Sequence, residues 1–305
     1  EYVNGDLYKI IWQPDETTVW QKNDENAKGQ VLATTLGNGV QGTYTYNTIG
    51  VPTSIKAAKG TASLLNIGYQ NIDARGNIKN RSEQTTSQSE NFTYDSMNRL
   101  TTGVEYGENG NILFKADAGT YQYEASRPHA IRSLSPTSND VLPKLDLSVT
   151  YNSVRLPVQL SEGNKVYTLT YNGENSRVKS QFVQNGSTVF TKYYCGPYEE
   201  ILKGGTTRKN YYIYAGGEIA AVYTEGTSDA GMYYYHNDHL GSPWLITNAS
   251  GVEVQRLNFN AWGRRRDVSD WDNYMNLPEM KFDRGFTGHE HLRSEERRVG
   301  KECRS

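Results

Sequence analysis

The segment from Tyr235 to Ser242, Tyr-His-Asn-Asp-His-Leu-Gly-Ser, is the densest group of residues that could do chemistry. Asp238, His239 and Ser242 are the three residue types of a nucleophilic triad, in which an acid orients a histidine that activates a hydroxyl. Neighbours in one tight turn rarely present these groups in a line, and the G-x-S-x-G pattern is absent. We therefore predict no catalytic residue here, with Asp238 and His239 binding turn backbone and Leu240 packed inward.

The histidines raise the separate question of a metal site. His236 and His239 are three residues apart, while His289 and His291 flank Glu290. Imidazole and carboxylate groups bind zinc, but residues 236 and 239 of a strand would face opposite sides of the sheet. No helical H-E-x-x-H pattern accompanies them. We therefore predict no metal ion, and we expect no cofactor.

The remaining reactive groups also favour structural roles. Cys195 follows a predicted strand and is expected to pack as a small apolar side chain. Glu199 and Glu200 are adjacent, so on a strand they point apart and do not form the carboxylate pair of a glycosidase. The sequence thus favours a protein that is not an enzyme.

Composition indicates broad sheets rather than a deep aliphatic core. Of 305 residues, 36% are hydrophobic, yet there are 23 tyrosines and 29 glycines. Tyrosine buries a large ring while its hydroxyl stays hydrated, and glycine supplies turns. The formal net charge is −2, so there is no basic excess for nucleic-acid binding. No apolar run approaches the roughly 20 residues of a membrane span, and no signal peptide is visible, so we expect the middle of a longer chain.

The last thirteen residues, 293–305, differ sharply from the rest. They read RSEERRVGKECRS, and this string resembles the conceptual translation of a common DNA-sequencing adaptor. We therefore interpret it as a non-native tail and exclude it from fold reasoning. The tail holds five of the 32 basic and three of the 34 acidic residues, which leaves 27 and 31 and a net charge of −4.

A short template recurs along the chain. A hydrophobic residue precedes Asp or Asn, and Gly or Asn follows three residues later. Asp and Asn nucleate turns by binding nearby backbone, and Gly or Asn tolerates positive φ. The copies are identified by Tyr46, Asp73 with Gly76, Tyr94 with Asp95, Tyr106 with Gly110, Tyr151, Tyr171 and Phe259, with a weaker copy at Tyr123.

These turns alternate with strand patterns such as Tyr167-x-Leu169-x-Tyr171. The template predicts strand–turn–strand units, with the Tyr151 copy one residue short and the Tyr171 copy one residue long. Polar stretches such as 81–90 are predicted to be exposed loops, and short helical pieces are predicted near 57–59 and 271–275. The fold class expected is all-β, with antiparallel hairpins forming a curved, spiralling sheet.

The repeats resemble tyrosine–aspartate (YD) repeats, and the later part resembles the RHS repeat-associated core. That core resemblance rests on two stretches, YYYHNDHLGSPWLITNASGVEVQRLNFNAWG and GFTGHEHL. Its marker residues here are Tyr235, Asp238, His239, Leu240, Gly241, Ser242, Gly251, Gly263, Gly285, Phe286 and Gly288. The resemblance implies a YD-repeat region over 1–225 and a truncated core over 226–292. The family often has Arg where Trp244 stands.

Membership of that family would imply a β-sheet shell that encloses a C-terminal effector, often a toxin. The expected partners are upstream shell repeats and the downstream effector, both missing here, together with immunity or secretion-apparatus proteins. The expected location is secreted or on a bacterial cell surface. Many such cores end in an aspartyl autoprotease with an Asp-Pro-rich region, but no Asp-Pro dipeptide occurs in this sequence. We therefore expect a non-catalytic fragment of a polymorphic-toxin-like protein.

Two alternatives remain open. One is an adhesion or carbohydrate-binding module that uses exposed Trp262 or Trp271. The other is an inactive remnant of a self-cleaving core.

Overall fold

A computed structural model describes residues 1–137 and 147–291, so the predicted tail lies outside the described residues. Within them the regular elements are 25 strands and one 3-10 turn, Phe286–Gly288. Every strand pairing recorded between them is antiparallel. The prediction of an all-β, antiparallel fold is confirmed.

The chain forms two compact units. The first contains Glu1–Leu100, Tyr212–Tyr223 and the described residues from Gly231 onward. The second contains Thr101–Tyr211 and Thr224–Ala230. The predicted division at 225 thus falls inside Thr224–Ala230 of the second unit, which lies in the sequence between two parts of the first unit, and the second unit also interrupts the predicted repeat region.

The first unit begins with a β1–β2 ribbon, Tyr2–Val3 with Asp6–Leu7, and an eight-stranded sheet. Its strands pair in sequence order because short turns connect each one to the next. They are β3 Lys9–Trp12, β4 Thr17–Glu25, β5 Val31–Leu36, β6 Gln41–Tyr46, β7 Pro52–Lys59, β8 Ala62–Gln70, β9 Asn80–Glu83 and β10 Gln88–Asn91.

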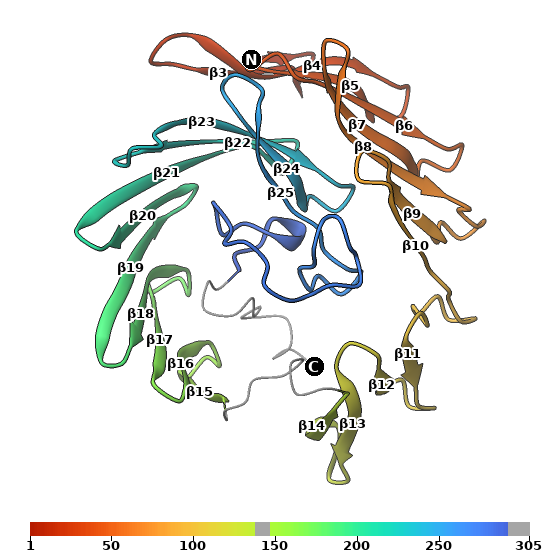
Figure 1. Ribbon diagram of the computed structural model, residues 1–305, viewed down its shortest axis with the longest axis vertical. Helices are drawn as coiled ribbons and strands as arrows, with labels where there is room; N and C mark the ends of the chain where they lie inside the picture. The colour runs from red at the N-terminus through yellow and green to blue at the C-terminus, as the bar shows by residue number, and fades with distance from the viewer. Residues whose placement is uncertain (138–146, 292–305) are drawn as a thin grey trace. The chain divides into compact units, whose positions relative to one another are not determined.

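A second layer of the first unit consists of hairpins near the end of the chain. Its strands are β23 Gly231–Asn237, β24 Pro243–Asn248 and β25 Glu253–Arg256, together with the first six residues of β22 Glu218–Glu225. Residues 257–291 follow as irregular chain (Figure 1). One apolar cluster joins this layer to the eight-stranded sheet through Leu65, Ile67 and Leu245, and another joins it to the irregular segment through Ile246 and Phe282. The hairpins are therefore the middle of three layers.

The second unit contains two runs of strands that also pair in sequence order. Phe182 and Phe190 pack against Tyr167 at ring-centroid distances of 6.3 and 6.1 Å, which gives this unit an aromatic core. One run is β11 Val104–Tyr106, β12 Ile112–Lys115, β13 Gly119–Glu124 and β14 Arg127–Pro136. The other includes β15 Leu147–Tyr151, β16 Pro157–Glu162, β17 Lys165–Tyr171, β18 Arg177–Gln184, β19 Ser187–Cys195, β20 Tyr198–Lys203 and β21 Thr206–Ala215, of which β21 passes into the first unit.

One five-residue turn recurs throughout both units. In each copy the N–H of position 1 donates to the carbonyl of position 5, and the N–H of position 4 donates to the carbonyl of position 1. Position 4 always has positive φ, which explains the frequent glycine there. The twelve copies among the described residues begin at Asn26, Leu36, Asn47, Asp73, Asp95, Gly107, Asn152, Asn172, Asp238, Asn248, Asn260 and Gly285.

In nine copies the Asp or Asn side chain completes the turn. Its Oδ1 accepts the backbone N–H groups of positions 3 and 5, as at Asp73, where Arg75 and Asn77 donate at 2.9 and 3.0 Å. The copies at Asn152 and Asn172 have the same spacing, so the predicted short and long variants were wrong. Arg155 and Asn175 occupy their fourth positions with φ of 63° and 62°.

Three further predictions were wrong. The predicted helical piece at 57–59 lies in β7, and residues 271–275 form turns. The predicted loop 81–90 contains most of β9 and β10, and Arg81 is buried. Residues 37–42, between β5 and β6, also have a G-x-G-x-x-G spacing, but a strand follows it, so it lacks the helix of a dinucleotide-binding turn.

Candidate functional site

The Asp238 turn connects β23 to β24 and is the centre of the predicted core motif. Asp238 is 2% exposed, and its Oδ1 accepts the N–H groups of Leu240 and Ser242, both at 2.9 Å. Its Oδ2 accepts the indole N–H of Trp244 at 3.3 Å. Gly241 occupies the fourth position with φ of 76°. The carboxylate is therefore used to hold the turn.

The other two triad candidates contact different segments. The Nδ1 atom of His239 lies 2.9 Å from the hydroxyl of Tyr69 on β8, and the Ser242 hydroxyl accepts the N–H of Thr287 at 3.0 Å. Within residues 1–137 and 147–291, no hydrogen bond joins His239 to Ser242. The geometry therefore contains no acid–histidine–nucleophile line. His239 binds the neighbouring sheet rather than its own turn, which differs from the prediction.

Several predicted marker residues have definite packing roles. Tyr235 is 4% exposed and lies over Phe282, with ring centroids 6.1 Å apart. Phe286 lies 6.1 Å from Phe259 in an edge-to-face contact. Leu240 does not pack inward as predicted, because it is 46% exposed at the tip of its turn.

The marker glycines are needed either for a positive φ angle or because a side chain would not fit. Gly251, Gly263 and Gly288 are the fourth residues of their turns, with φ of 73°, 76° and 69°. At Gly285 a Cβ atom would lie 2.4 Å from Nε2 of His291, so the site requires the absence of a side chain. That same Nε2 accepts the N–H of Phe286, which closes the last described turn.

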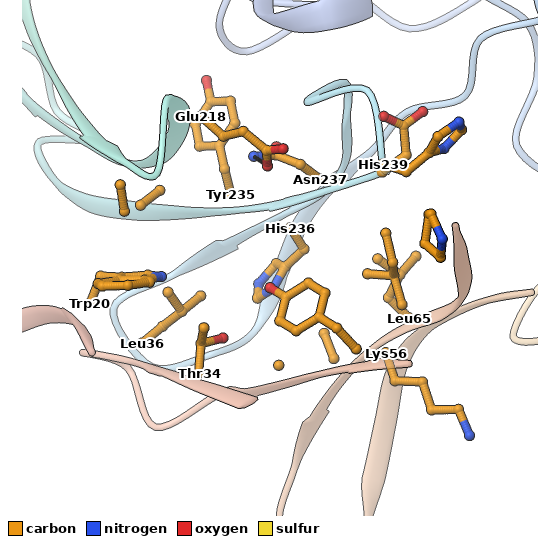
Figure 2. A pocket seen from close by; sticks show the side chains of 18 of the residues that line it. Trp20, Thr34, Leu36, Lys56, Leu65, Glu218, Tyr235, His236, Asn237 and His239 are labelled. Atoms are coloured by element: carbon orange, nitrogen blue, oxygen red, sulfur yellow. Dashed lines mark hydrogen bonds between the residues drawn. The ribbon is translucent and has the colours of Figure 1, made fainter. Parts of the chain in front are cut away.

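A polar cavity of about 350 Å³ lies beside the Asp238 turn, between β5–β8 and the hairpin layer. Figure 2 shows His236 on the same side of β23 as Trp20 and Thr34, whereas Tyr235 and Asn237 point to the opposite side. This alternation is a consequence of the two-residue period of a strand. The lining combines neutral hydrogen-bonding groups with few carboxylates, which is suitable for water or a small polar molecule.

Glu218 lies at the edge of this cavity next to the Asp238 turn. Its Oε2 accepts the amide of Asn237 at 3.3 Å. Burial of the carboxyl raises the pKa of Glu218, and the nearby charge of Asp238 raises it further. The position is a candidate only for binding, since the described contacts give it no nucleophile to activate.

His236 is a buried neutral histidine within the same layer. Its Nε2 lies 3.0 Å from the hydroxyl of Thr247, which also accepts the amide of Asn38 on the opposite sheet. Burial lowers the pKa of His236 to about 3, and the guanidinium of Arg256 contributes in the same direction. The histidine therefore joins the two layers in its uncharged form.

We expect this histidine to make the protein sensitive to acid. Below pH 6.5 His236 is protonated in the unfolded chain but stays neutral in the folded protein. The free energy of unfolding therefore falls as pH decreases toward 3. Between pH 7 and pH 5 the loss from this residue is about 2 kcal/mol. Urea titrations at both pH values measure it, and His236→Gln should remove that part of the difference. An unchanged pH dependence in the variant would contradict the assignment.

An ionic centre that sequence reasoning missed joins β9–β10 to the irregular segment. Arg81 Nε donates to Glu90 Oε1 at 2.8 Å, and Arg266 donates to both oxygens of Glu90 at 2.6 and 3.0 Å. The two arginine side chains are 5% and 4% exposed. No local sequence pattern predicts this centre, because Arg266 is distant in sequence from the other two residues. Only the pairing of these charges in the folded protein compensates the cost of burying them.

Two tryptophans surround this ionic centre. The guanidinium carbon of Arg81 lies 5.3 Å from the Trp244 ring centroid and 5.8 Å from that of Trp271. The tryptophans meet each other edge-to-face at 5.7 Å. Trp244 thus fills a buried place, 1% exposed, at the position where the resembled family often has Arg. Trp271 is 4% exposed, so its predicted use as an exposed glycan platform was wrong.

Cys195 and His289 take structural positions rather than forming a site with other reactive groups of the described ranges. Cys195 is exposed rather than packed, because it ends β19 at a turn. His289 contacts Thr287 through Nδ1 at 2.7 Å. Across the described ranges, no group of three metal-ligating side chains includes any of the histidines discussed above. None of the helical residues that the structure describes could span a membrane.

No family model matches the sequence, and no curated protein matches it. Among solved structures, the fold is similar to a chain of the Photorhabdus luminescens Tc holotoxin pore carrying the TccC3-D651A mutation, with a TM-score of 0.65 and 14% identity. That match covers 91% of this chain and 17% of the other. The crystal structure of TcdB2-TccC3 gives a TM-score of 0.63 at 13% identity, over 90% of this chain and 17% of that one. This chain therefore shares its fold with about a sixth of a Tc toxin chain.

Proposed function

We propose that this chain is a non-catalytic wall segment of an RHS-type shell that encloses and presents a C-terminal effector domain. The observation that carries the proposal is the fold match to Tc toxin chains over nine-tenths of the sequence. The repeated five-residue turn supports it, because one backbone device, used twelve times among the described residues, can build a continuous wall from short hairpins. The RHS resemblance of the Asp238 turn is consistent with the same role.

The contacts of the most reactive residues support a structural role. Asp238 holds its turn and Trp244, His239 binds Tyr69, and Ser242 receives the backbone of the last segment. His239 and Ser242 connect parts of the first unit that are distant in sequence, whereas the bonds of Asp238 are local. A residue whose hydrogen bonds are committed to packing is a poor acid, base or nucleophile.

The enclosed effector is suggested by the similar proteins. One similar structure is described as TcdB2-TccC3 without its hypervariable C-terminal region, and two others combine TcdB2-TccC3 with TEV or Cdc42. By analogy, the segment following residue 292 in the natural protein would be variable cargo. Secretion or surface display, a toxin cargo, immunity partners and self-cleavage further downstream belong to the same proposal.

The test uses the complete natural protein that contains this segment. We expect the region downstream of residue 292 to be digested by proteinase K at least about tenfold more slowly within the protein than when produced alone. The matched control is the complete protein with Glu90→Gln and Arg266→Met, which should expose the region again. Equal digestion rates for enclosed and isolated cargo would refute encapsulation.

A further inference from the structure

Four of the Asp/Asn turns follow one another along one edge of the eight-stranded sheet. They begin at Asn26, Asn47, Asp73 and Asp95 and come after β4, β6, β8 and β10 (Figure 1). Each turn is therefore placed beside the next by strand pairing. Contacts between consecutive turns can be compared position by position.

The fifth residue of each turn contacts the fourth residue of the next. Gln30 Nε2 donates to the carbonyl of Gly50 at 2.9 Å. Val51 Cγ2 lies 3.4 Å from the place where Gly76 would carry a Cβ atom. Asn77 Nδ2 donates to Oδ1 of Asn98 at 3.0 Å. The same pair of positions thus meets at all three steps.

The third residue adds a contact in the same direction. Lys28 Nζ donates to the carbonyl of Thr48 at 2.8 Å, and Arg75 Nη1 donates to the carbonyl of Ser96 at 3.0 Å. Thr48 and Ser96 are both second residues of their turns. Ile49, the third residue of the second turn, is apolar. The step from the second turn to the third therefore has an apolar contact, Val51 against Gly76, where the other two steps have hydrogen bonds.

A tyrosine before the turn provides the reciprocal contact. Tyr94 precedes the Asp95 turn, and its hydroxyl donates to the carbonyl of Ile78, just after the previous turn, at 2.9 Å. In the second unit Tyr171 donates to Pro157 at 2.9 Å with the same relation between turns. This gives the tyrosine of the YD pair a specific partner on the preceding turn.

The row has two different ends. At the first turn Gly29 occupies the fourth position and is open, with nothing within 4 Å of a Cβ atom placed there. At the last turn the fifth residue, Arg99, binds its own Asp95 at 2.6 Å, and the third residue, Met97, is 71% exposed. The fourth position of the first turn is therefore open, while the fifth residue of the last turn binds its own first residue.

We propose that positions 3 and 5 of each turn select the turn that stacks next to it, and that the open face of Asn26–Gln30 docks one preceding hairpin. The docked hairpin would carry a basic residue at position 3 and an amide at position 5, as Lys28 with Gln30 and Arg75 with Asn77 do. The basic side chain would donate to the carbonyl of Ala27, and the amide would contact the open side of Gly29. The code is directional, since the side chains at positions 3 and 5 contact the following turn, whereas the contact to the preceding turn comes from the tyrosine before the turn.

Amide hydrogen exchange by NMR tests the direction on the full chain. Lys28→Met with Gln30→Val should accelerate exchange of the Ile49 and Val51 amides about fivefold to tenfold and leave Met97 and Arg99 unchanged. Arg75→Met with Asn77→Val should accelerate Met97 and Arg99 but not Ile49 or Val51. Arg75→Lys should retain protection, because Lys28 performs the same task.

The matched control is Lys56→Met with Gln70→Val, which changes the same residue types in the same sheet outside the turns. It should leave all four amides unchanged. Equal acceleration of both neighbouring turns, or the same effect from the control, would overturn the code.

The docking part is tested by adding one copy of hairpin 63–83 at the N-terminus. Exchange of the Lys28 and Gln30 amides should slow about fivefold. The same extension with Arg75→Ala and Asn77→Ala in the added copy should not protect them. Equal exchange with the two extensions would refute docking at this face.

Discussion

Replacing Glu90 with glutamine should lower the free energy of unfolding by about 3–5 kcal/mol. The substitution preserves the shape of the side chain but leaves Arg81 and Arg266 buried without a counter-charge. Both arginines are nearly inaccessible, so neither can recover the loss by turning into solvent. Chemical denaturation followed by tryptophan fluorescence reports the change directly, since Trp244 and Trp271 surround the site.

Glu25→Gln is the control for Glu90→Gln. Glu25 forms an ion pair with Lys22 on β4 whose carboxylate is 38% exposed. Exposed pairs contribute about 0–1 kcal/mol, so this variant should be nearly neutral. Similar losses for both variants would show that the buried ionic centre contributes no more to stability than an exposed ion pair.

The same centre should contribute to acid sensitivity with a defined sign. Burial by itself would raise the pKa of Glu90, but the charges of Arg81 and Arg266 outweigh it and hold the pKa below its usual value. A carboxyl with a lowered pKa stabilises the fold above its unfolded pKa, and that stability is lost as pH falls through the folded pKa. The loss from Glu90 therefore occurs at lower pH than the onset of the loss from His236.

Replacing Asp238 with alanine should cost about 3 kcal/mol, the second largest effect that we expect. The change removes the acceptor of two backbone N–H groups in a buried turn and the partner of the Trp244 indole. Buried donors without acceptors bear their full desolvation cost. Thermal unfolding monitored by near-ultraviolet circular dichroism would detect both the lost stability and the freed tryptophan.

Asp238→Asn is the matched control because the chain uses asparagine at six of the nine side-chain-capped turns. The amide oxygen can accept the same two N–H groups, as it does at Asn248 and Asn260. The NH2 group that replaces Oδ2 cannot accept the Trp244 indole N–H, so we expect a cost of about 1–2 kcal/mol, smaller than that of Asp238→Ala. A large loss in Asp238→Asn would mean that the negative charge itself is required at this turn.

The five-residue turn could be predicted from the sequence. Asp73 and Gly76 are spaced as the turn requires, because an Asp/Asn cap and a positive-φ residue act within five consecutive residues. Even there, Arg155 shows the limit: the turn imposes positive φ on a residue that does not favour it. Spacing inferred from glycine and asparagine alone therefore misplaced that copy.

The burial of residues by distant segments could not be predicted from the sequence in the same way. The polar segment at Arg81 and Glu90 looked like a loop because charged residues are usually exposed. Leu240 was expected inside, yet it lies at a turn tip, while Trp271 was expected outside and is buried against Trp244. Each outcome depends on which distant segment covers the residue.

The amino-acid sequence by itself therefore determined the all-β class, the repeated turn and the structural use of Asp238. These properties depend on backbone preferences and hydrogen bonds between residues a few positions apart. Only the tertiary structure decided the Arg81–Glu90–Arg266 centre, the His239–Tyr69 contact and the directional stacking of turns. Those interactions join residues up to 176 positions apart, and their energies exist only once packing removes water from both partners.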